Sequence, residues 1–369
     1  MKAGIVGLPN VGKSTLFNAL TQSYAAQAAN FPFATIEPNV GIVDVKDPRL
    51  DKLAEVSNSQ KKIYATMKFV DIAWLVKWAS QWEWLGNKFL ANIREVDAII
   101  QVVRYFEDPD VSHVEWKIDP LRDIEIINTE LILADMAQIE DKLPYLHKKA
   151  QQKDKDAQLT YSALKKIYDA LEQWKLVIQI QDQLTDAEKQ IIKPYNFLTM
   201  KPFLYVLNIW EDQLCEASKI YDQFKDKVPW DLVLVSAKLE EEMIGLDEDE
   251  KKEFLSDIAQ NCNKSPQQIP TLNDLIKTAF DRLGLTYFFT SWEKESRAWT
   301  IKKWTKAPQA AWVIHTDFEK WFVKAEVVNW QDFVQAGWWH KAREKGLVRL
   351  EGKEYEVQDG DVILFRFAK

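Results

Sequence analysis

A phosphate-binding loop lies at the start of the chain. Residues 7–14 read Gly-Leu-Pro-Asn-Val-Gly-Lys-Ser, which fits the pattern G-x-x-x-x-G-K-[ST]. Gly7 and Gly12 would let the backbone bend so that successive N–H groups point at a β-phosphate. Lys13 would reach the β- and γ-phosphates, and the hydroxyl of Ser14 would coordinate Mg²⁺. The spacing therefore predicts binding of a nucleoside triphosphate together with Mg²⁺.

The neighbours of this loop fit the same chemistry. Residues 2–6 are an apolar run that predicts a strand, and residues 15–20 predict a helix. The N-terminus of that helix would place its positive dipole end near the phosphates. We expect the loop to contact the nucleotide through six residues, and we take Lys13 also as a candidate catalytic residue. The six are Asn10, Val11, Gly12, Lys13, Ser14 and Thr15.

Two further residues are candidate partners of the metal ion. Asp71 ends an apolar run, where a carboxylate can hold a water molecule of Mg²⁺. Thr35 lies between the phosphate-binding loop and Asp71, the place of a switch threonine. In an Asp-x-x-Gly motif the glycine N–H approaches the γ-phosphate closely. Here that fourth position is Trp74.

The base would be read by a second set of residues. Ras-like proteins read guanine with Asn-Lys-x-Asp after a late strand, and this chain has Asn208-Ile-Trp-Glu211 there. The lysine is missing, and glutamate is one methylene longer than aspartate, so guanine selection should be weak and adenine could be accepted. Ser236 and Ala237 follow the next predicted strand, where a loop that stacks on the base belongs.

The residue that orients the attacking water is not at its usual place. Leu75 occupies the position of the water-orienting glutamine of Ras-like proteins, and an apolar side chain cannot orient water. His113 lies in a loop after a predicted strand and is the candidate replacement. An ordinary loop histidine is the alternative.

The apolar pattern predicts an α/β fold with a doubly wound, Ras-like core. Runs rich in β-branched residues alternate with helical stretches. We expect a nucleotide-binding domain made of residues 1–127 and 203–283, and an inserted antiparallel helical hairpin over residues 128–202. Short β segments after residue 284 predict a small α+β domain, residues 284–369. The predicted core strands lie at residues 40–45, 67–73, 98–106, 203–209 and 232–237.

The amino-acid composition and net charge argue against some classes of protein. The net charge is −8, which argues against a protein that coats nucleic acid in general. No run of 18 apolar residues is present, so no membrane span is expected. Cys215 and Cys262 are too few for a disulfide framework, so we expect reduced thiols and a cytoplasmic location.

Residues 142–175 hold eight Lys and four Asp or Glu, and residues 284–369 are also net basic. Contact with RNA phosphates would most naturally use these two regions.

Tryptophan is unusually frequent and glycine unusually rare. The chain has 16 Trp but only 11 Gly, whereas average usage predicts roughly 26 Gly in this length. Tryptophan therefore occupies positions where glycine is expected. Four of the indoles crowd the segment that follows Asp71: Trp74, Trp78, Trp82 and Trp84.

Taken together, these motifs resemble the YchF family of Obg-like ATPases nearly from end to end. Besides the phosphate-binding loop, the similar segments are Asn30-Phe-Pro-Phe-Ala-Thr-Ile-Glu-Pro-Asn39, Asp71-Ile-Ala, Leu85-Gly-Asn-Lys-Phe-Leu90, Asn128-Thr-Glu130, Arg297-Ala-Trp-Thr300, Ala307-Pro-Gln-Ala-Ala311, His315-Thr-Asp-Phe-Glu-Lys320 and Asp359-Gly-Asp361. The resemblance implies a Ras-like ATPase core, a coiled-coil insertion and a C-terminal TGS domain of the β-grasp type. It also implies ATP as substrate in preference to GTP, Mg²⁺ as cofactor, and the ribosome as partner.

The departures from the family pattern share one form. Where the family pattern suggests glycine, the chain has tryptophan; Trp299 is tryptophan in the family too. Mutation would not so often exchange one residue type for one other, and we hypothesise a gene in which UGA codes for glycine but has been translated as tryptophan. A naturally Trp-rich protein is the alternative. The positions are Trp74, Trp78, Trp82, Trp84, Trp116, Trp174, Trp292, Trp304, Trp312 and Trp321.

Three functional interpretations remain open from the sequence. The first is a ribosome-associated ATPase that acts as a switch in translation or stress response. The second is a nucleotide-gated binding module without hydrolysis, which genuine tryptophans would favour. The third, a GTPase of the Obg type, is disfavoured by Ile209 and Glu211.

Overall fold

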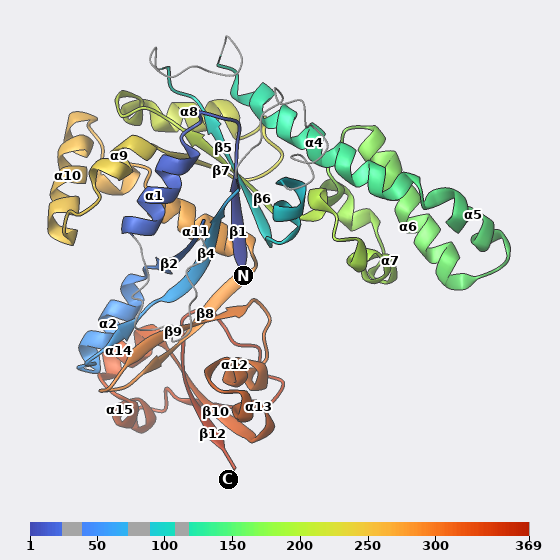
Figure 1. Ribbon diagram of the computed structural model, residues 1–369. Helices are drawn as coiled ribbons and strands as arrows, with labels where there is room; N and C mark the ends of the chain where they lie inside the picture. Colours follow the sequence, from blue (N-terminus) through green and yellow to red (C-terminus); the bar gives the residue numbers. More distant parts are fainter. Residues whose placement is uncertain (24–38, 73–88, 108–117, 369) are drawn as a thin grey trace. The chain divides into compact units, whose positions relative to one another are not determined.

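The computed structural model describes all residues except 24–38, 73–88, 108–117 and 369 (Figure 1). The chain divides into two compact units. Apart from these four segments, the first contains residues 1–23, 38–41 and 69–275, and the second contains residues 42–68 and 276–369. None of the described helices is long and apolar enough to cross a membrane.

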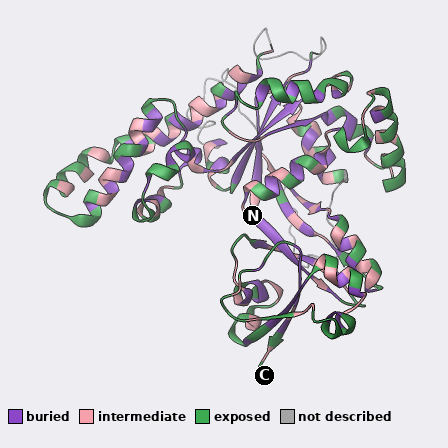
Figure 2. Ribbon diagram, turned by 180° about the vertical axis from the view of Figure 1, so that it is seen from behind, coloured by how far each residue is buried: buried purple, intermediate pink, exposed green. Residues whose placement is uncertain are grey.

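The first sheet carries the nucleotide-binding motifs. Its six strands follow the order β2-β4-β1-β5-β6-β7, and β1, β5, β6 and β7 pair in parallel. All residues of β5, β6 and β7 are buried (Figure 2), which explains their near-continuous apolar sequence. This is the doubly wound sheet that the sequence predicts. The strands are β1 (Lys2–Val6), β2 (Val40–Val45), β4 (Ala65–Asp71), β5 (Ala98–Arg104), β6 (Phe203–Asn208) and β7 (Leu232–Val235).

Helices of the first unit cover this sheet (Figure 1). Ile220 and Phe224 of α8 pack with Leu207 and Leu234 of the strands in one buried cluster. The helices here are α1 (Lys13–Ser23), α8 (Ala217–Phe224), α9 (Ala237–Glu242), α10 (Glu248–Asn261) and the start of α11 (Leu272–Arg282), whose residues after Leu275 belong to the second unit. Short 3₁₀ turns are η5 (Asp212–Glu216) and η6 (Pro266–Gln268).

A helical hairpin extends from the same unit (green in Figure 1). Apolar residues at steps of three and four from Ile132 to Ala150 form a heptad spacing that predicts one continuous first helix, but the structure has two helices there, α4 and α5. Pro144 lies in the first turn of α5, where its ring and missing N–H prevent the first helix from continuing. The elements are α4 (Pro120–Glu140), α5 (Leu143–Gln151), α6 (Lys155–Glu172), η2 (Val177–Gln183), α7 (Asp186–Ile192), η3 (Lys193–Tyr195) and η4 (Leu198–Met200).

The second unit has a mixed sheet of its own, in the order β11-β10-β12-β8-β9-β3. Phe288, Ala325 and Phe365 belong to its apolar core. Residues 42–68 join this unit, since β3 pairs with β9 in parallel. The strands are β3 (Lys62–Ile63), β8 (Leu285–Ser291), β9 (Ser296–Lys302), β10 (Phe322–Asn329), β11 (Arg349–Glu351) and β12 (Asp361–Phe367), and the helices are α2 (Pro48–Val56), α12 (Ala307–Ile314), α13 (Thr316–Lys320), α14 (Trp330–Ala336) and α15 (Trp339–Glu344).

Candidate nucleotide-binding site

The phosphate-binding loop joins the end of β1 to the start of α1. Asn10 (φ 61°) and Gly12 (φ 88°) both adopt the left-handed conformation. The N–H of Leu16 then donates to the carbonyl oxygen of Gly12 at 2.9 Å, which starts the helix. A Cβ atom at Gly7 would come within 2.6 Å of the carbonyl oxygen of Val102, so glycine is required there for steric reasons.

Lys13 and Asp71 form the charged part of the site. Burial lowers the pKa of Lys13, and the nearby Asp71 carboxylate partly opposes that shift. Burial raises the pKa of Asp71, and Lys13 opposes it in turn. Within the described part of the chain, Asp71 Oδ1 is buried and has no hydrogen-bond partner. Leaving a buried acceptor without a partner costs free energy. The unpaired oxygen of Asp71 therefore fits a carboxylate that receives a hydrogen bond from a water molecule of Mg²⁺.

Asn208 connects the phosphate-binding loop to the base-binding loop. Its Nδ2 donates to the carbonyl oxygen of Val11 at 3.0 Å, and its Oδ1 accepts from the N–H of Ala237 at 3.0 Å. A Cβ atom at Gly12 would lie 2.2 Å from Asn208 Nδ2, so the asparagine fills the space that glycine leaves. The structure thereby brings together residues that are separated by about 200 positions in the sequence.

The environment of Glu211 is suited to binding a hydrogen-bond donor. Glu211 Oε1 is buried and accepts no hydrogen bond from the residues that the structure describes. Next to it, the Trp210 ring stacks on Phe106 with centroids 5.2 Å apart. Lys238 Nζ lies 4.7 Å from the Trp210 ring centroid. Lys238 follows Ala237 directly, so the two base-binding segments touch each other.

Ser236 has a structural role besides its predicted place in the base-binding loop. It is the N-cap of α9, and its Oγ accepts from the N–H of Leu239 at 3.4 Å. Ser236 is completely buried, and Ala237 is 2% exposed. The backbone of this loop is therefore fixed by β7 before it and by α9 after it.

Three of the predicted features lie outside the described residues. They are the metal-binding candidate Thr35, the catalytic candidate His113, and the Asp-x-x-Gly position Trp74 with its neighbours Leu75, Trp78, Trp82 and Trp84. Trp116 is also outside. The remaining predicted site residues lie on the loop, on β4, after β6 and after β7, and their roles stay predictions.

Two tryptophans adopt a backbone conformation that favours glycine. Trp174 has φ 57° and Trp304 has φ 69°. Trp174 follows the end of α6, where the N–H of Lys175 bonds back to the carbonyl oxygen of Ala170 in the pattern of a glycine-terminated helix. Trp174 is 60% exposed and Trp304 75%, so neither indole gains much by burial. The geometry at both positions is that expected for glycine.

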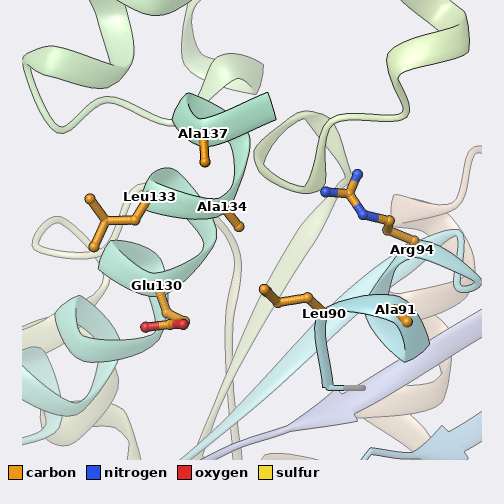
Figure 3. Close-up of a pocket in the computed structure, with 7 residues that line it drawn as sticks. All are labelled: Leu90, Ala91, Arg94, Glu130, Leu133, Ala134 and Ala137. Atoms are coloured by element: carbon orange, nitrogen blue, oxygen red, sulfur yellow. The ribbon is translucent and has the colours of Figure 1, made fainter. Parts of the chain in front are cut away.

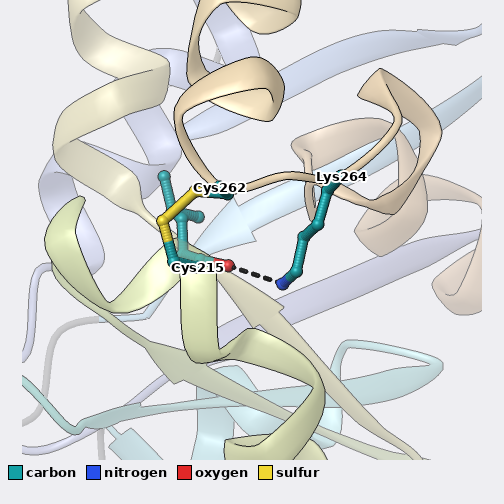
Figure 4. Close-up of a disulfide and its surroundings, with 4 residues drawn as sticks. Cys215, Cys262 and Lys264 are labelled. Atoms are coloured by element: carbon teal, nitrogen blue, oxygen red, sulfur yellow. Dashed lines mark hydrogen bonds between the residues drawn. A yellow bond between two sulfur atoms is a disulfide. The ribbon is translucent and has the colours of Figure 1, made fainter.

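The two cysteines contradict the expectation of reduced thiols. Cys215 and Cys262 form a disulfide across 47 residues (Figure 4). It joins η5, which follows Glu211, to the C-terminal end of α10. Lys264 Nζ donates to the carbonyl oxygen of Leu214 at 3.0 Å beside it. This pair could not be predicted from the spacing of the cysteines, because only the folding of η5 against α10 brings the sulfur atoms together.

A cavity of about 440 Å³ lies elsewhere in the first unit (Figure 3). Leu90, Ala91 and Arg94 line one side, and residues of α4 such as Glu130 and Leu133 line the other. None of the predicted site residues contributes to it. We therefore assign the nucleotide to the phosphate-binding loop and not to this cavity.

Comparison with known proteins agrees with the geometry of the site. The family profile YchF-GTPase_C, described as a protein of unknown function, matches residues 285–368. The profile MMR_HSR1, described as a 50S ribosome-binding GTPase, matches residues 2–133.

Individual relatives match over the whole chain. "Ribosome-binding ATPase YchF" of Bacillus subtilis is 48% identical over 100% of this chain and 99% of its own length. The protein of the same name from Haemophilus influenzae is 49% identical over 99% of both. A solved structure, the YchF GTPase of Schizosaccharomyces pombe, is 36% identical, covers 99% of this chain and 97% of its own, and superposes with a TM-score of 0.84.

Proposed function

This chain belongs to the YchF family, and from that premise we propose that it is a ribosome-associated ATPase. It binds ATP with Mg²⁺, hydrolyses ATP in preference to GTP, and acts as a nucleotide-dependent switch in translation or stress response. The relatives carry the name ribosome-binding ATPase. A ribosome-bound protein of this kind works in the cytoplasm.

The observation that carries the proposal is the connection made by Asn208. One side chain holds the phosphate-binding loop through Val11 and the base-binding loop through Ala237. The loop proposed to bind the phosphates and the loop proposed to bind the base are therefore held in a fixed position relative to each other before a nucleotide binds. Such pre-organisation lowers the entropic cost of binding.

Lys13 supplies the positive charge for the phosphates. Its ammonium group lies in a partly desolvated place, where its interaction with a γ-phosphate is stronger than in water. The loop backbone and the N-terminus of α1 add N–H donors. Ser14, Asp71 and Thr35 would hold Mg²⁺, which neutralises charge on the β- and γ-phosphates when bound. His113 remains our candidate for orienting the attacking water.

Glu211 is our candidate for selecting adenine. Its buried Oε1 offers an acceptor, and the exocyclic amino group of adenine is a donor. Without a lysine at Ile209 to cover the ring, the Asn-Lys-x-Asp arrangement for guanine is incomplete. A GTPase is thus the weaker alternative. A binding module without hydrolysis is favoured only if Trp74 is a genuine residue beside the γ-phosphate.

For the ribosome we propose contact through the tip of the hairpin, with the C-terminal unit as the alternative. Helix α5 has no buried residue and carries Lys148 and Lys149 in its last turn. Lys153 lies in the connection to α6, and Lys155 is the first residue of α6. A solvent-exposed basic tip suits the phosphates of ribosomal RNA, on the large subunit or the whole ribosome.

Phosphate release tests the proposal. Purified protein with Mg²⁺ should release phosphate from ATP faster than from GTP, and addition of ribosomes should change the rate. The protein is made once with the printed sequence and once with glycine at the ten tryptophan positions named above. Binding without release in both forms would support the module without hydrolysis, and faster release from GTP would support the GTPase.

A further inference from the structure

A buried carboxylate lies directly behind the base-binding loop. Glu240 of α9 is 2% exposed, whereas its neighbours Glu241 and Glu242 are exposed. Glu240 Oε1 accepts from the backbone N–H of Leu272 at 2.7 Å, at the first residue of α11. A carboxyl group is costly to bury unless it is hydrogen-bonded. The N–H at the start of α11, with the positive end of the helix dipole, supplies that hydrogen bond.

Helix α9 needs this anchor because it is very short. It runs from Ala237 to Glu242, only six residues, and a helix of that length is not stable on its own in water. Asn208 holds its first residue through the N–H of Ala237. The hydrogen bond that Glu240 accepts from the N–H of Leu272 holds the helix a second time, three residues after Ala237.

The two anchors act on the same short segment. Between them the backbone of residues 236–240 has little freedom to rotate or slide. Lys238, the exposed residue of the segment, lies over the ring of Trp210, the residue that precedes Glu211 in the chain. Loss of either anchor should therefore loosen the segment that meets the base, while the phosphate-binding loop keeps its own contacts with β1 and α1.

We propose that Glu240 is a positioning residue for the purine. The hydrogen bond that it accepts from Leu272 holds α9 in place, and with it the N-terminal residues of this helix, Ser236 to Lys238, against the base. The inference rests on the proposed function only in taking this site to bind a purine nucleotide. It assigns no contact between Glu240 and the nucleotide, and it places Glu240 outside the chemical step.

The test measures three ligands by calorimetry with the full chain: ATP, GTP and inorganic tripolyphosphate, which has no base. Glu240→Ala removes the hydrogen-bond acceptor. Glu240→Asp shortens the side chain by one methylene, so that the acceptor lies farther from Leu272. Glu240→Gln keeps an acceptor oxygen on a side chain of the same length. Glu241→Ala is the matched control, an exposed carboxylate on the same helix. Circular dichroism confirms the fold of each variant.

We expect Glu240→Ala and Glu240→Asp to weaken binding of the preferred nucleotide about tenfold, with tripolyphosphate binding and kcat changed less than twofold. Glu240→Gln and Glu241→Ala should bind like the wild type. Wild-type nucleotide affinity in folded Glu240→Ala would overturn the proposal, and so would equal weakening in Glu240→Gln or an equal loss of tripolyphosphate binding. If Glu240→Ala does not fold, the nucleotide affinity of Glu240→Asp is the test, and wild-type affinity in that variant would overturn the proposal. Failure of the proposed function appears separately, as a wild-type protein that binds neither nucleotide or hydrolyses neither.

Discussion

The side-chain amide of Asn208 donates a hydrogen bond to the carbonyl oxygen of Val11 at 3.0 Å. The bond crosses from the end of β6 to the phosphate-binding loop after β1, and β5 separates these two strands in the sheet. Gly12 has no side chain to obstruct it. Base recognition and phosphate recognition are thus parts of one structure.

Lys13→Ala should reduce ATP turnover at least a hundredfold without unfolding the protein. The substitution removes the charge that faces the phosphates, and Lys13 is only partly buried and lies outside the apolar core. Phosphate release and thermal melting measure the two effects. Lys219→Ala, on an exposed lysine, is the control. Turnover at the wild-type rate in Lys13→Ala would place the active site elsewhere.

Changing Lys148, Lys149, Lys153 and Lys155 to glutamate should weaken co-sedimentation with ribosomes. It should also flatten the dependence of binding on salt, because fewer counterions are released from RNA. A matched set of four exposed lysines in the nucleotide-binding unit, Lys219, Lys225, Lys227 and Lys252, also changed to glutamate, controls for the change in net charge. If binding is unchanged, the contact lies in the C-terminal unit or near the nucleotide.

Trp174→Gly and Trp304→Gly should each raise the free energy of unfolding by about 1 kcal/mol, because a non-glycine residue in this conformation is strained. Urea denaturation measures the change. Trp321 is similarly exposed, at 52%, but has φ −99°, so Trp321→Gly should bring no gain. Equal effects at all three positions would remove backbone strain as the cause.

The gene provides an independent check of the glycine hypothesis. The codons at Trp74, Trp292, Trp304, Trp312 and Trp321 should be UGA, whereas Trp299 should be UGG. UGG at every position would end that hypothesis and leave a module without hydrolysis as the leading interpretation.

Glu240 should make stability depend on pH near neutrality. Burial raises its pKa from 4.5 to about 7. A carboxyl whose pKa is raised by folding contributes full stability below pH 4.5, and that contribution is lost as the pH rises through 7. The loss should be about 3 kcal/mol. Among the described groups, Lys251 and Asp274 are the charged neighbours that act on it, in opposite directions.

Urea unfolding of the wild type and Glu240→Gln at pH 5 and pH 8 isolates this contribution. The difference in free energy of unfolding between the two proteins should shift by about 3 kcal/mol in favour of Glu240→Gln as the pH rises. The same difference at both pH values would show that Glu240 does not titrate in this range.

The sequence was most informative where local chemistry determines structure. The phosphate-binding loop and the helix after it could be predicted because glycine, lysine and serine at this spacing have few other uses. The break between α4 and α5 was missed, because the heptad spacing continues through it, although Pro144 in the first turn of α5 marks it. These signals involve residues close together in the chain.

Long-range pairing could not be predicted in the same way. Only two residues of β3, Lys62 and Ile63, pair with β9 and join residues 42–68 to the C-terminal sheet. Glu240 looks like Glu241 and Glu242 in the sequence, and only the position of α11 makes it a buried anchor. The Cys215–Cys262 spacing is equally uninformative before folding.

Calorimetric titration of the wild-type protein with ATP and with GTP, both with Mg²⁺, tests the central claim most directly. The account predicts tighter binding of ATP, because the lysine that covers guanine is absent and the longer side chain of Glu211 disturbs the paired contacts that aspartate makes to guanine, while its buried oxygen can still accept from the adenine amino group. Glu211→Gln, which replaces one acceptor oxygen by a donor nitrogen, should reduce that preference. A wild-type protein that binds GTP more tightly than ATP would contradict the account.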